Sequence, residues 1–124
     1  MKLLLDTHVL LWALADSPKL GRKFREKIRD STNDVLVSAA TMWEIAIKKR
    51  LGKLSVPDNL LEFIEASDIT PLPINSAHAM AAVALPLHHT DPFDRMLIAQ
   101  ARQENFVLVS RDRRFEAYQV DLLK

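Results

Sequence analysis

Acidic side chains stand where the sequence predicts that secondary-structure elements begin and end. Asp6 follows the apolar run LLL, Glu44 lies inside AATMWEIAI, Asp91 and Asp94 belong to DPFD, and Asp112 comes just after FVLVS. Carboxylates gathered in one cleft repel one another, and a divalent cation neutralises them. Mg²⁺ and Mn²⁺ are hard ions that prefer carboxylate oxygens and water. If the fold brings these side chains together, the sequence predicts a Mg²⁺ or Mn²⁺ site.

Four of these acids also have structural interpretations that need no metal. Asp6 can cap the helix that follows it. Asp91 and Asp94 fit the N-cap and the third position of a helix that starts at residue 92, where the helix dipole favours negative charge. Asp112 suits a turn. Each interpretation is reasonable alone, but all of them must hold together to remove the metal site.

Glu44 is harder to explain without a partner. It can pair with Lys48 one helical turn later, which is worth about 0.3–0.5 kcal/mol on a helix surface. Glu44 is, however, the only charged residue of AATMWEIAI, so much of the surrounding helix is expected to be buried. A buried carboxylate needs a stronger partner than a solvated lysine.

The elements that must position these acids alternate between strand and helix. The apolar runs and helical periodicities predict strands at residues 3–5, 35–37, 69–74, 106–109 and 119–122, helices at 7–14, 20–30, 39–51, 57–66, 76–85 and 92–104, and a short turn or helix at 113–117. Two prolines in ITPLPI favour an edge strand there. The alternation predicts an α/β fold with a mostly parallel sheet covered on both faces. Ligands of such sheets bind beyond the carboxyl ends of the strands.

The composition indicates a single globular domain over residues 1–124. The chain is 48% hydrophobic and 27% charged, and it has no cysteine, which excludes disulfides, thiolate metal sites and thiol nucleophiles. A net charge of +1 means that nucleic-acid binding would depend on local clusters. No apolar run approaches the ~20 residues of a membrane span. Asp6 and His8 interrupt the N-terminal apolar stretch, so we expect no signal peptide and a cytoplasmic protein.

Histidines and basic runs carry weaker signals. His8, His88 and His89 fit no tight zinc spacing and lack thiolate partners, so a zinc site is not expected. The runs GRKFREKIR and KKRLGK are interpreted first as solvated helix faces and second as RNA contacts.

Four segments together resemble the PIN-domain ribonucleases, most closely the VapC-type toxins of bacterial and archaeal toxin–antitoxin pairs. They are LLLDTH, SAATMWEIAIKKRLGKL, HHTDPFDRMLIAQA and LVSRDRRF, which occur in the expected order over nearly the whole chain. HTDPFDRMLIAQA is the most diagnostic. The resemblance implies a PIN-like α/β/α sandwich.

The same resemblance implies which acids form the site. The family's acidic quartet falls on Asp6, Glu44, Asp94 and Asp112, where Asp112 belongs to the SRD turn. We expect Asp91 and Ser110 to help hold these ligands in position without binding the metal themselves. From charge alone, we add candidates for steering the RNA backbone: Lys48, Arg95, Arg111 and Arg113.

The implied activity is a Mg²⁺- or Mn²⁺-dependent endoribonuclease that hydrolyses phosphodiester bonds. Family toxins are inhibited by a cognate VapB-like antitoxin whose tail enters the active-site groove, and they commonly form homodimers. The expected partners are therefore RNA, such an antitoxin and a second copy of the chain, with no membrane contact.

Other interpretations fit the residues less well. A haloacid-dehalogenase-like phosphatase needs an acid two residues after Asp6, where this chain has His8. A receiver domain needs an acidic pair and a late lysine, and a dinucleotide-binding domain needs a glycine-rich turn, whereas Gly21 and Gly52 are the only glycines. The main alternative is a catalytically silent PIN scaffold that binds RNA or a partner protein.

Overall fold

The computed structural model describes residues 1–123. They form a five-stranded sheet in which every strand pair is parallel, together with the helices that cover it. The strand order is β3-β2-β1-β4-β5, so β1 lies at the centre. The strands are β1 Lys2–Leu5, β2 Asp34–Ser38, β3 Ile69–Leu72, β4 Val107–Val109 and β5 Leu122–Leu123. The predicted α/β class is confirmed, and the sheet is wholly parallel. Its carboxyl ends therefore lie along one edge.

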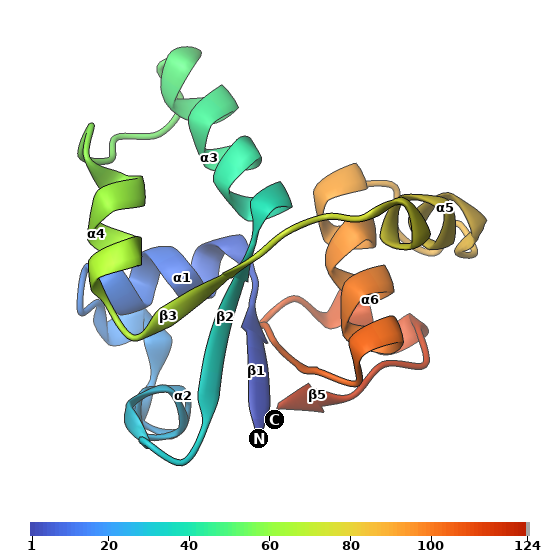
Figure 1. Cartoon of the computed structure of the whole chain (residues 1–124), viewed down its shortest axis with the longest axis horizontal. Coiled ribbons are helices and arrows are strands. Elements are labelled where there is room, and N and C mark those ends of the chain that lie inside the picture. Colours follow the sequence, from blue (N-terminus) through green and yellow to red (C-terminus); the bar gives the residue numbers. More distant parts are fainter. Residues whose placement is uncertain (124) are drawn as a thin grey trace.

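Helices cover both faces of this sheet (Figure 1). The α-helices are α1 Thr7–Leu14, α2 Arg22–Arg29, α3 Ala39–Arg50, α4 Leu60–Ala66, α5 Ser76–Ala84 and α6 Pro92–Glu104, and two short 3₁₀ helices are η1 Pro18–Leu20 and η2 Arg113–Ala117. In Figure 1, α1, α2 and α4 lie on one side of the sheet, and α5 and α6 lie on the other. This arrangement is the predicted α/β/α sandwich.

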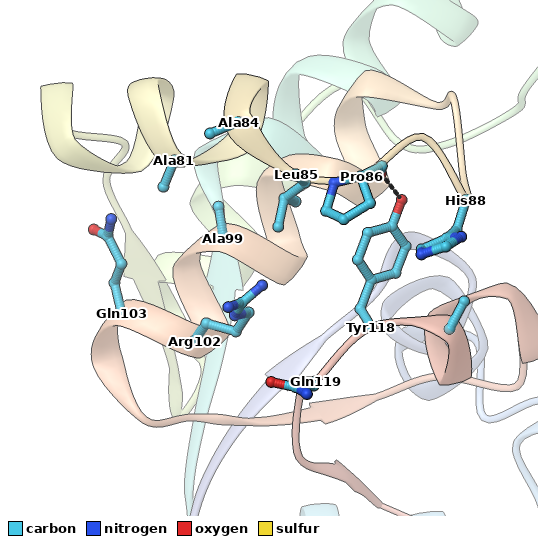
Figure 2. Close-up of a pocket in the computed structure, with 11 residues that line it drawn as sticks. Ala81, Ala84, Leu85, Pro86, His88, Ala99, Arg102, Gln103, Tyr118 and Gln119 are labelled. Atoms are coloured by element: carbon cyan, nitrogen blue, oxygen red, sulfur yellow. Dashed lines mark hydrogen bonds between the residues drawn. The ribbon is translucent and has the colours of Figure 1, made fainter.

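Successive side chains of β1 point to opposite faces of the sheet, and each face has its own hydrophobic core. Leu4 points to one face, where it belongs to a cluster with residues of α5, α6 and η2. In that region Leu85 and Ala99 lie near the ring of Tyr118 (Figure 2). Burial on both faces explains why three consecutive leucines, Leu3 to Leu5, follow Lys2 in β1.

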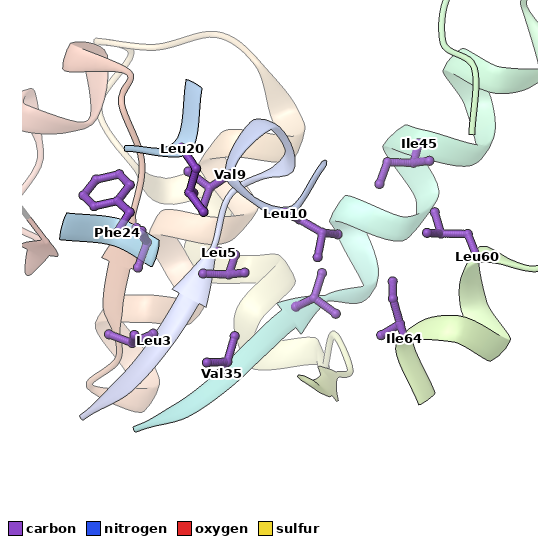
Figure 3. Packing of buried hydrophobic residues seen from close by; sticks show 12 residues of the cluster. Leu3, Leu5, Val9, Leu10, Leu20, Phe24, Val35, Ile45, Leu60 and Ile64 are labelled. Carbon is purple, nitrogen blue, oxygen red and sulfur yellow. The ribbon is translucent and has the colours of Figure 1, made fainter. Parts of the chain in front are cut away.

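Leu3 and Leu5 point to the opposite face. They pack with Val9 of α1, Phe24 of α2 and Ile64 of α4 (Figure 3). All three leucines of β1 are fully buried. The central strand is thus clamped from both sides, which fixes the position of the residue that follows it.

Besides β3, which ends at Leu72 and not at residue 74, the structure differs from the predicted elements in three places. Gly21, at φ +81°, separates η1 from α2 within the helix predicted at 20–30. The helix predicted from residue 57 begins at Leu60, after a turn in which Asp58 pairs with Lys49. The last strand is shifted to Leu122–Leu123, because Val120 N–H bonds back to the Tyr118 carbonyl in a turn.

The prolines act as predicted at the sheet edge. Pro71 lies in β3, which is an edge strand and has β2 as its neighbour on one side. A proline on the open side of an edge strand removes no ladder hydrogen bond. Within residues 1–123, no helix is both long and apolar enough to span a bilayer.

Candidate active site

Asp6 lies at the junction of the central strand and α1. Its backbone N–H donates to the Val109 carbonyl at 3.1 Å, which extends the pairing of β1 with β4. Its Oδ1 accepts the Val9 N–H at 2.9 Å, as an N-cap does, and its Oδ2 accepts the Ser110 hydroxyl at 2.5 Å. Burial raises the pKa of Asp6, although these hydrogen bonds oppose the shift. Asp6 is therefore both a helix cap and a buried carboxylate at the sheet edge.

The carboxylate of Glu44, in the middle of α3, accepts hydrogen bonds from two side chains. Lys48 Nζ lies 2.5 Å from Oε2, so the predicted pairing is present, and the Thr7 hydroxyl donates to Oε1 at 2.5 Å. Glu44 is 5% exposed. The Thr7 contact ties α3 to the start of α1, directly beside Asp6. In the sequence, Thr7 is a candidate cap of the first helix beside Asp6, but its contact with Glu44 is not predictable from that position.

Asp91 and Asp94 occupy the first turn of α6. Asp91 is the N-cap, and its Oδ1 accepts the N–H groups of Phe93 and Asp94 at 2.8 and 3.1 Å. Asp94 Oδ2 lies 2.7 Å from Nε2 of His89. Burial, followed by repulsion from the Asp91 carboxylate, raises the pKa of Asp94 to about 6. The Asp6 carboxylate adds to this shift, which places it within electrostatic reach.

Asp112 caps η2 after strand β4. Its backbone N–H donates to the Ser110 hydroxyl oxygen at 2.9 Å, and the same hydroxyl donates to Asp6. Arg114 binds the Asp112 carboxylate and holds its pKa below the usual value. Ser110 thus links Asp6, which follows β1, to Asp112, which follows β4.

The fold brings part of the predicted quartet together with a histidine. Ligand atoms of His89, Asp94 and Asp112 all lie within 4.8 Å of one another. Asp6 and Glu44 lie outside this group of three. Ser110 connects Asp6 to Asp112, and Thr7 connects Glu44 to the start of α1. His89, which the sequence offers only as a zinc ligand, lies five residues before Asp94 in HHTDPFD, and that spacing is the signal for this contact.

Comparisons with known proteins agree with this architecture. Residues 3–120 match the PIN domain family model. The chain belongs to the PIN-domain family. It is 31% identical over 123 residues to a Mycobacterium tuberculosis protein named Ribonuclease VapC22, and the match covers 93% of this chain and 90% of that protein. The resemblance to VapC-type PIN domains is thereby confirmed.

Solved structures share the fold of this PIN domain at lower identity. The Rickettsia felis VapBC2 complex bound to a promoter DNA fragment superposes with a TM-score of 0.74 at 15% identity, covering 99% of this chain and 98% of that one. The Neisseria gonorrhoeae FitAcB structure gives 0.70 at 23% identity, covering 98% and 96%. These likenesses establish the PIN fold.

The carboxylates of this PIN domain suit a hard divalent cation. Asp6, Glu44, Asp94 and Asp112 offer oxygen atoms only, the ligands that Mg²⁺ and Mn²⁺ prefer. Burial and the Asp91 carboxylate raise the pKa of Asp94, and repulsion from the Asp6 carboxylate adds to the shift. A cation would relieve that repulsion. The donor set therefore fits the metal that the family implies.

Arg95 was predicted to contact RNA, and its position corrects that prediction. It is 8% exposed, and its Nη1 donates to the Pro86 carbonyl at 2.8 Å. Its Nη2 donates to the Leu85 and Ala82 carbonyls at 2.8 and 2.9 Å. The guanidinium satisfies carbonyls at the end of α5 and in the following loop, as cations do at helix C-termini. It has no free face for a phosphate.

The other predicted cations remain nearer the surface. Arg113 is exposed at the start of η2. Arg111 donates to the Leu20 carbonyl at 2.8 Å and lies over the ring of Phe24, 3.9 Å from its centroid. Its guanidinium is thus partly committed to the packing of η1 and α2.

Two cavities of this PIN domain lie away from the acids. One, of about 690 Å³, lies between α5, α6 and the segment after η2, beside the hydrogen bond from Tyr118 to the Pro86 carbonyl (Figure 2). The other, of about 590 Å³, lies between α1 and α4 and is lined by Leu11, Trp12 and Phe63. None of the four predicted ligands lines either cavity.

Proposed function

We propose that this PIN domain is a VapC-like endoribonuclease that hydrolyses RNA phosphodiester bonds with the help of Mg²⁺ or Mn²⁺. The observation that carries the proposal is the convergence of Asp94 and Asp112 within 4.8 Å, beyond the carboxyl ends of the central strands. The identity to a relative named as a ribonuclease supports it.

Asp6, Glu44, Asp94 and Asp112 would hold the cation. The chemistry that such a cation supplies when bound is the activation of a water and the neutralisation of charge on the phosphate. Ser110 and Asp91 keep the ligands in place, the first by bonding Asp6 and the second by capping α6. Asp6 and Glu44 are each 5% exposed and would form the floor of the site. The carboxylates bind and orient, and none of them acts as a nucleophile.

Cations around the acids would bind the RNA backbone. Lys48 and Arg114 contact the acids directly, and Arg113 is exposed beside Arg114. Once a metal neutralises the carboxylates, the side chains of Lys48 and Arg114 become available to phosphates. Arg111 contributes at the rim.

An antitoxin and a second copy of the chain complete the proposal. A further structure with this fold is a toxin–antitoxin complex from Klebsiella pneumoniae (TM-score 0.64, 18% identity). The groove between α1 and α4 has an apolar lining in which Phe63 is 55% exposed, and an amphipathic VapB-like segment would cover it. Trp43, Met80 and Val83 are exposed on α3 and α5, where a homodimer would bury them. We place this activity in the cytoplasm, where RNA is available.

The test compares wild type with Asp94→Asn on single-stranded RNA, in Mg²⁺, in Mn²⁺ and in EDTA. Asp121→Asn, which removes a carboxylate from an exposed position, is the matched control. We expect cleavage by wild type and Asp121→Asn only, abolished by EDTA. Equal cleavage by Asp94→Asn would show that the site is wrong.

The competing function is a silent PIN scaffold. It predicts that wild type binds RNA or a partner protein without cutting RNA under any of these conditions. In that case the acids would act only as helix caps and ion-pair partners. Binding of RNA without cleavage, measured in Mn²⁺, decides for the scaffold.

A further inference from the structure

We infer that His89 is a positioning residue of the proposed metal centre: its imidazole N–H fixes the carboxylate of Asp94 so that one oxygen faces the cation. The inference rests on the proposed function, because it assigns a role toward the metal. It begins from the separation of 2.7 Å between His89 Nε2 and Asp94 Oδ2.

The two ring nitrogens of His89 have different partners. Nδ1 lies 3.4 Å from the backbone N of Asp91, whose N–H can only donate. Nδ1 must therefore carry the lone pair, which leaves the proton of the neutral ring on Nε2. That proton points to Asp94. A nitrogen that donates its proton in this way has no lone pair for a metal, so the geometry favours positioning over direct ligation.

The backbone around His89 is held as firmly as its ring. The His89 N–H donates to the Tyr118 hydroxyl oxygen at 2.9 Å, and the His89 carbonyl accepts from Arg95 Nη1 at 3.1 Å. Tyr118 in turn donates to the Pro86 carbonyl at 2.7 Å (Figure 2). Hydrogen bonds from the side chains of Tyr118 and the buried Arg95 thus hold the loop between α5 and α6 at two points.

The His89 ring is also packed. It is 3% exposed as a residue and meets the Phe115 ring edge-on, with centroids 6.0 Å apart. A buried, packed and hydrogen-bonded ring has one orientation. Its partner carboxylate therefore has one orientation as well.

The consequence falls on the two oxygens of Asp94. Oδ2 accepts from His89, and within residues 1–123 Oδ1 has no hydrogen-bond donor. Oδ1 is the oxygen left for a cation, and one carboxylate oxygen of Asp94 lies within 4.8 Å of a carboxylate oxygen of Asp112. Residues that hydrogen-bond metal ligands in this way typically change metal affinity about 10- to 100-fold when removed.

The test measures Mn²⁺ binding to the full chain by isothermal titration, without RNA. We compare wild type with His89→Ala and His89→Gln, since the Gln amide can donate from near the Nε2 position. His88→Ala is the matched control, because His88 is the neighbouring histidine, is exposed and faces the Tyr118 ring. Thermal unfolding without metal checks that each variant is folded.

We expect His89→Ala to bind Mn²⁺ at least ~10-fold more weakly, and His89→Gln and His88→Ala to stay within ~3-fold of wild type. In an Asp94→Asn background, His89→Ala should cause no further loss, because it acts through Asp94.

The outcomes separate the two proposals. If wild type binds no Mn²⁺, the metal centre of the proposed function fails and the role of His89 fails with it. If wild type binds and His89→Ala binds equally well, only the role of His89 is overturned. A further loss in the Asp94→Asn background would also overturn it and would make His89 a direct ligand.

Discussion

Two side-chain nitrogens of Arg114 donate hydrogen bonds to the carboxylate of Asp112. Its Nη2 lies 2.6 Å from Oδ2, and its Nε lies 3.1 Å from both carboxylate oxygens. The Arg114 side chain is 63% exposed, so water screens this pair. Arg114 thus places a positive charge directly beside the Asp112 carboxylate.

This pairing predicts that Arg114 competes with the metal. We expect Arg114→Gln to bind Mn²⁺ a few-fold more tightly, because Asp112 loses its partner and the site loses a positive charge. Affinity for RNA should fall in the same variant. Titration of Mn²⁺ and a filter-binding assay with RNA measure the two effects, with Arg102→Gln, an exposed position on α6, as control. Weaker Mn²⁺ binding would mean instead that Arg114 orients Asp112 for the cation.

Metal binding should depend on pH through Asp94. Its pKa is raised to about 6 by burial and by Asp91, so below pH 6 a proton occupies the carboxyl and must leave when a cation binds. We expect Mn²⁺ affinity to rise between pH 5 and pH 7, by about tenfold per unit below the pKa. Calorimetric titrations across this range measure it. A flat profile would contradict the prediction.

The same shift sets the stability of the metal-free protein. Between the unfolded value of 3.8 and about 6, the folded state holds a proton on Asp94 that the unfolded state has released. The free energy of unfolding therefore falls as pH rises through this window. Asp94→Asn should reduce that fall, which thermal unfolding from pH 4 to pH 7 detects. An unchanged slope in the variant would assign the effect to another group.

Arg95 should matter for stability. We expect Arg95→Met to lower the free energy of unfolding by roughly 2–4 kcal/mol, because buried carbonyls of residues 82–89 lose their donor. Arg95→Lys should recover little, since one ammonium cannot replace the planar fork. Urea unfolding measures both. Arg113→Met, at an exposed position of η2, should change the free energy of unfolding by less than about 0.5 kcal/mol. If Arg95→Met and Arg113→Met lower stability equally, the hydrogen bonds of Arg95 do not stabilise the fold as we expect.

Thr7 and Thr41 offer a matched pair of buried hydroxyls. Thr7 donates to Glu44 at 2.5 Å, whereas the Thr41 hydroxyl has no hydrogen-bond partner within residues 1–123. We expect Thr7→Val to lose about 1–2 kcal/mol of stability and Thr41→Val to be neutral or slightly stabilising. Urea unfolding compares them, and a larger loss in Thr41→Val would reverse the assignment.

The elements that position the acids were predictable because each has a local cause. Leu3 to Leu5 form a buried strand because apolar residues face both cores, and Asp6 and Asp91 start helices because their side chains accept N–H groups of the first turn. Such signals lie within a few residues of one another. They need no knowledge of tertiary packing.

The contacts of Arg95 and His89 were not predictable in the same way. The sequence shows that Arg95 is charged, but not that the end of α5 folds back over it. His89 lies close to Asp94 in sequence, yet its hydrogen bond depends on a loop held by Tyr118, which lies 29 residues away from it. Gly21 also has a neighbour distant in sequence, because a Cβ at this position would lie 2.5 Å from Nη2 of Arg111.

The hydrogen bond between Ser110 and Asp6 joins residues 104 positions apart. Strand β1 receives one neighbour early, when β2 is made, and the other only when β4 follows α6. A ribosome therefore releases nearly the whole chain before Asp6 meets Ser110 and Asp112. The proposed site is therefore assembled only when β4 pairs with β1, late in the synthesis of the chain.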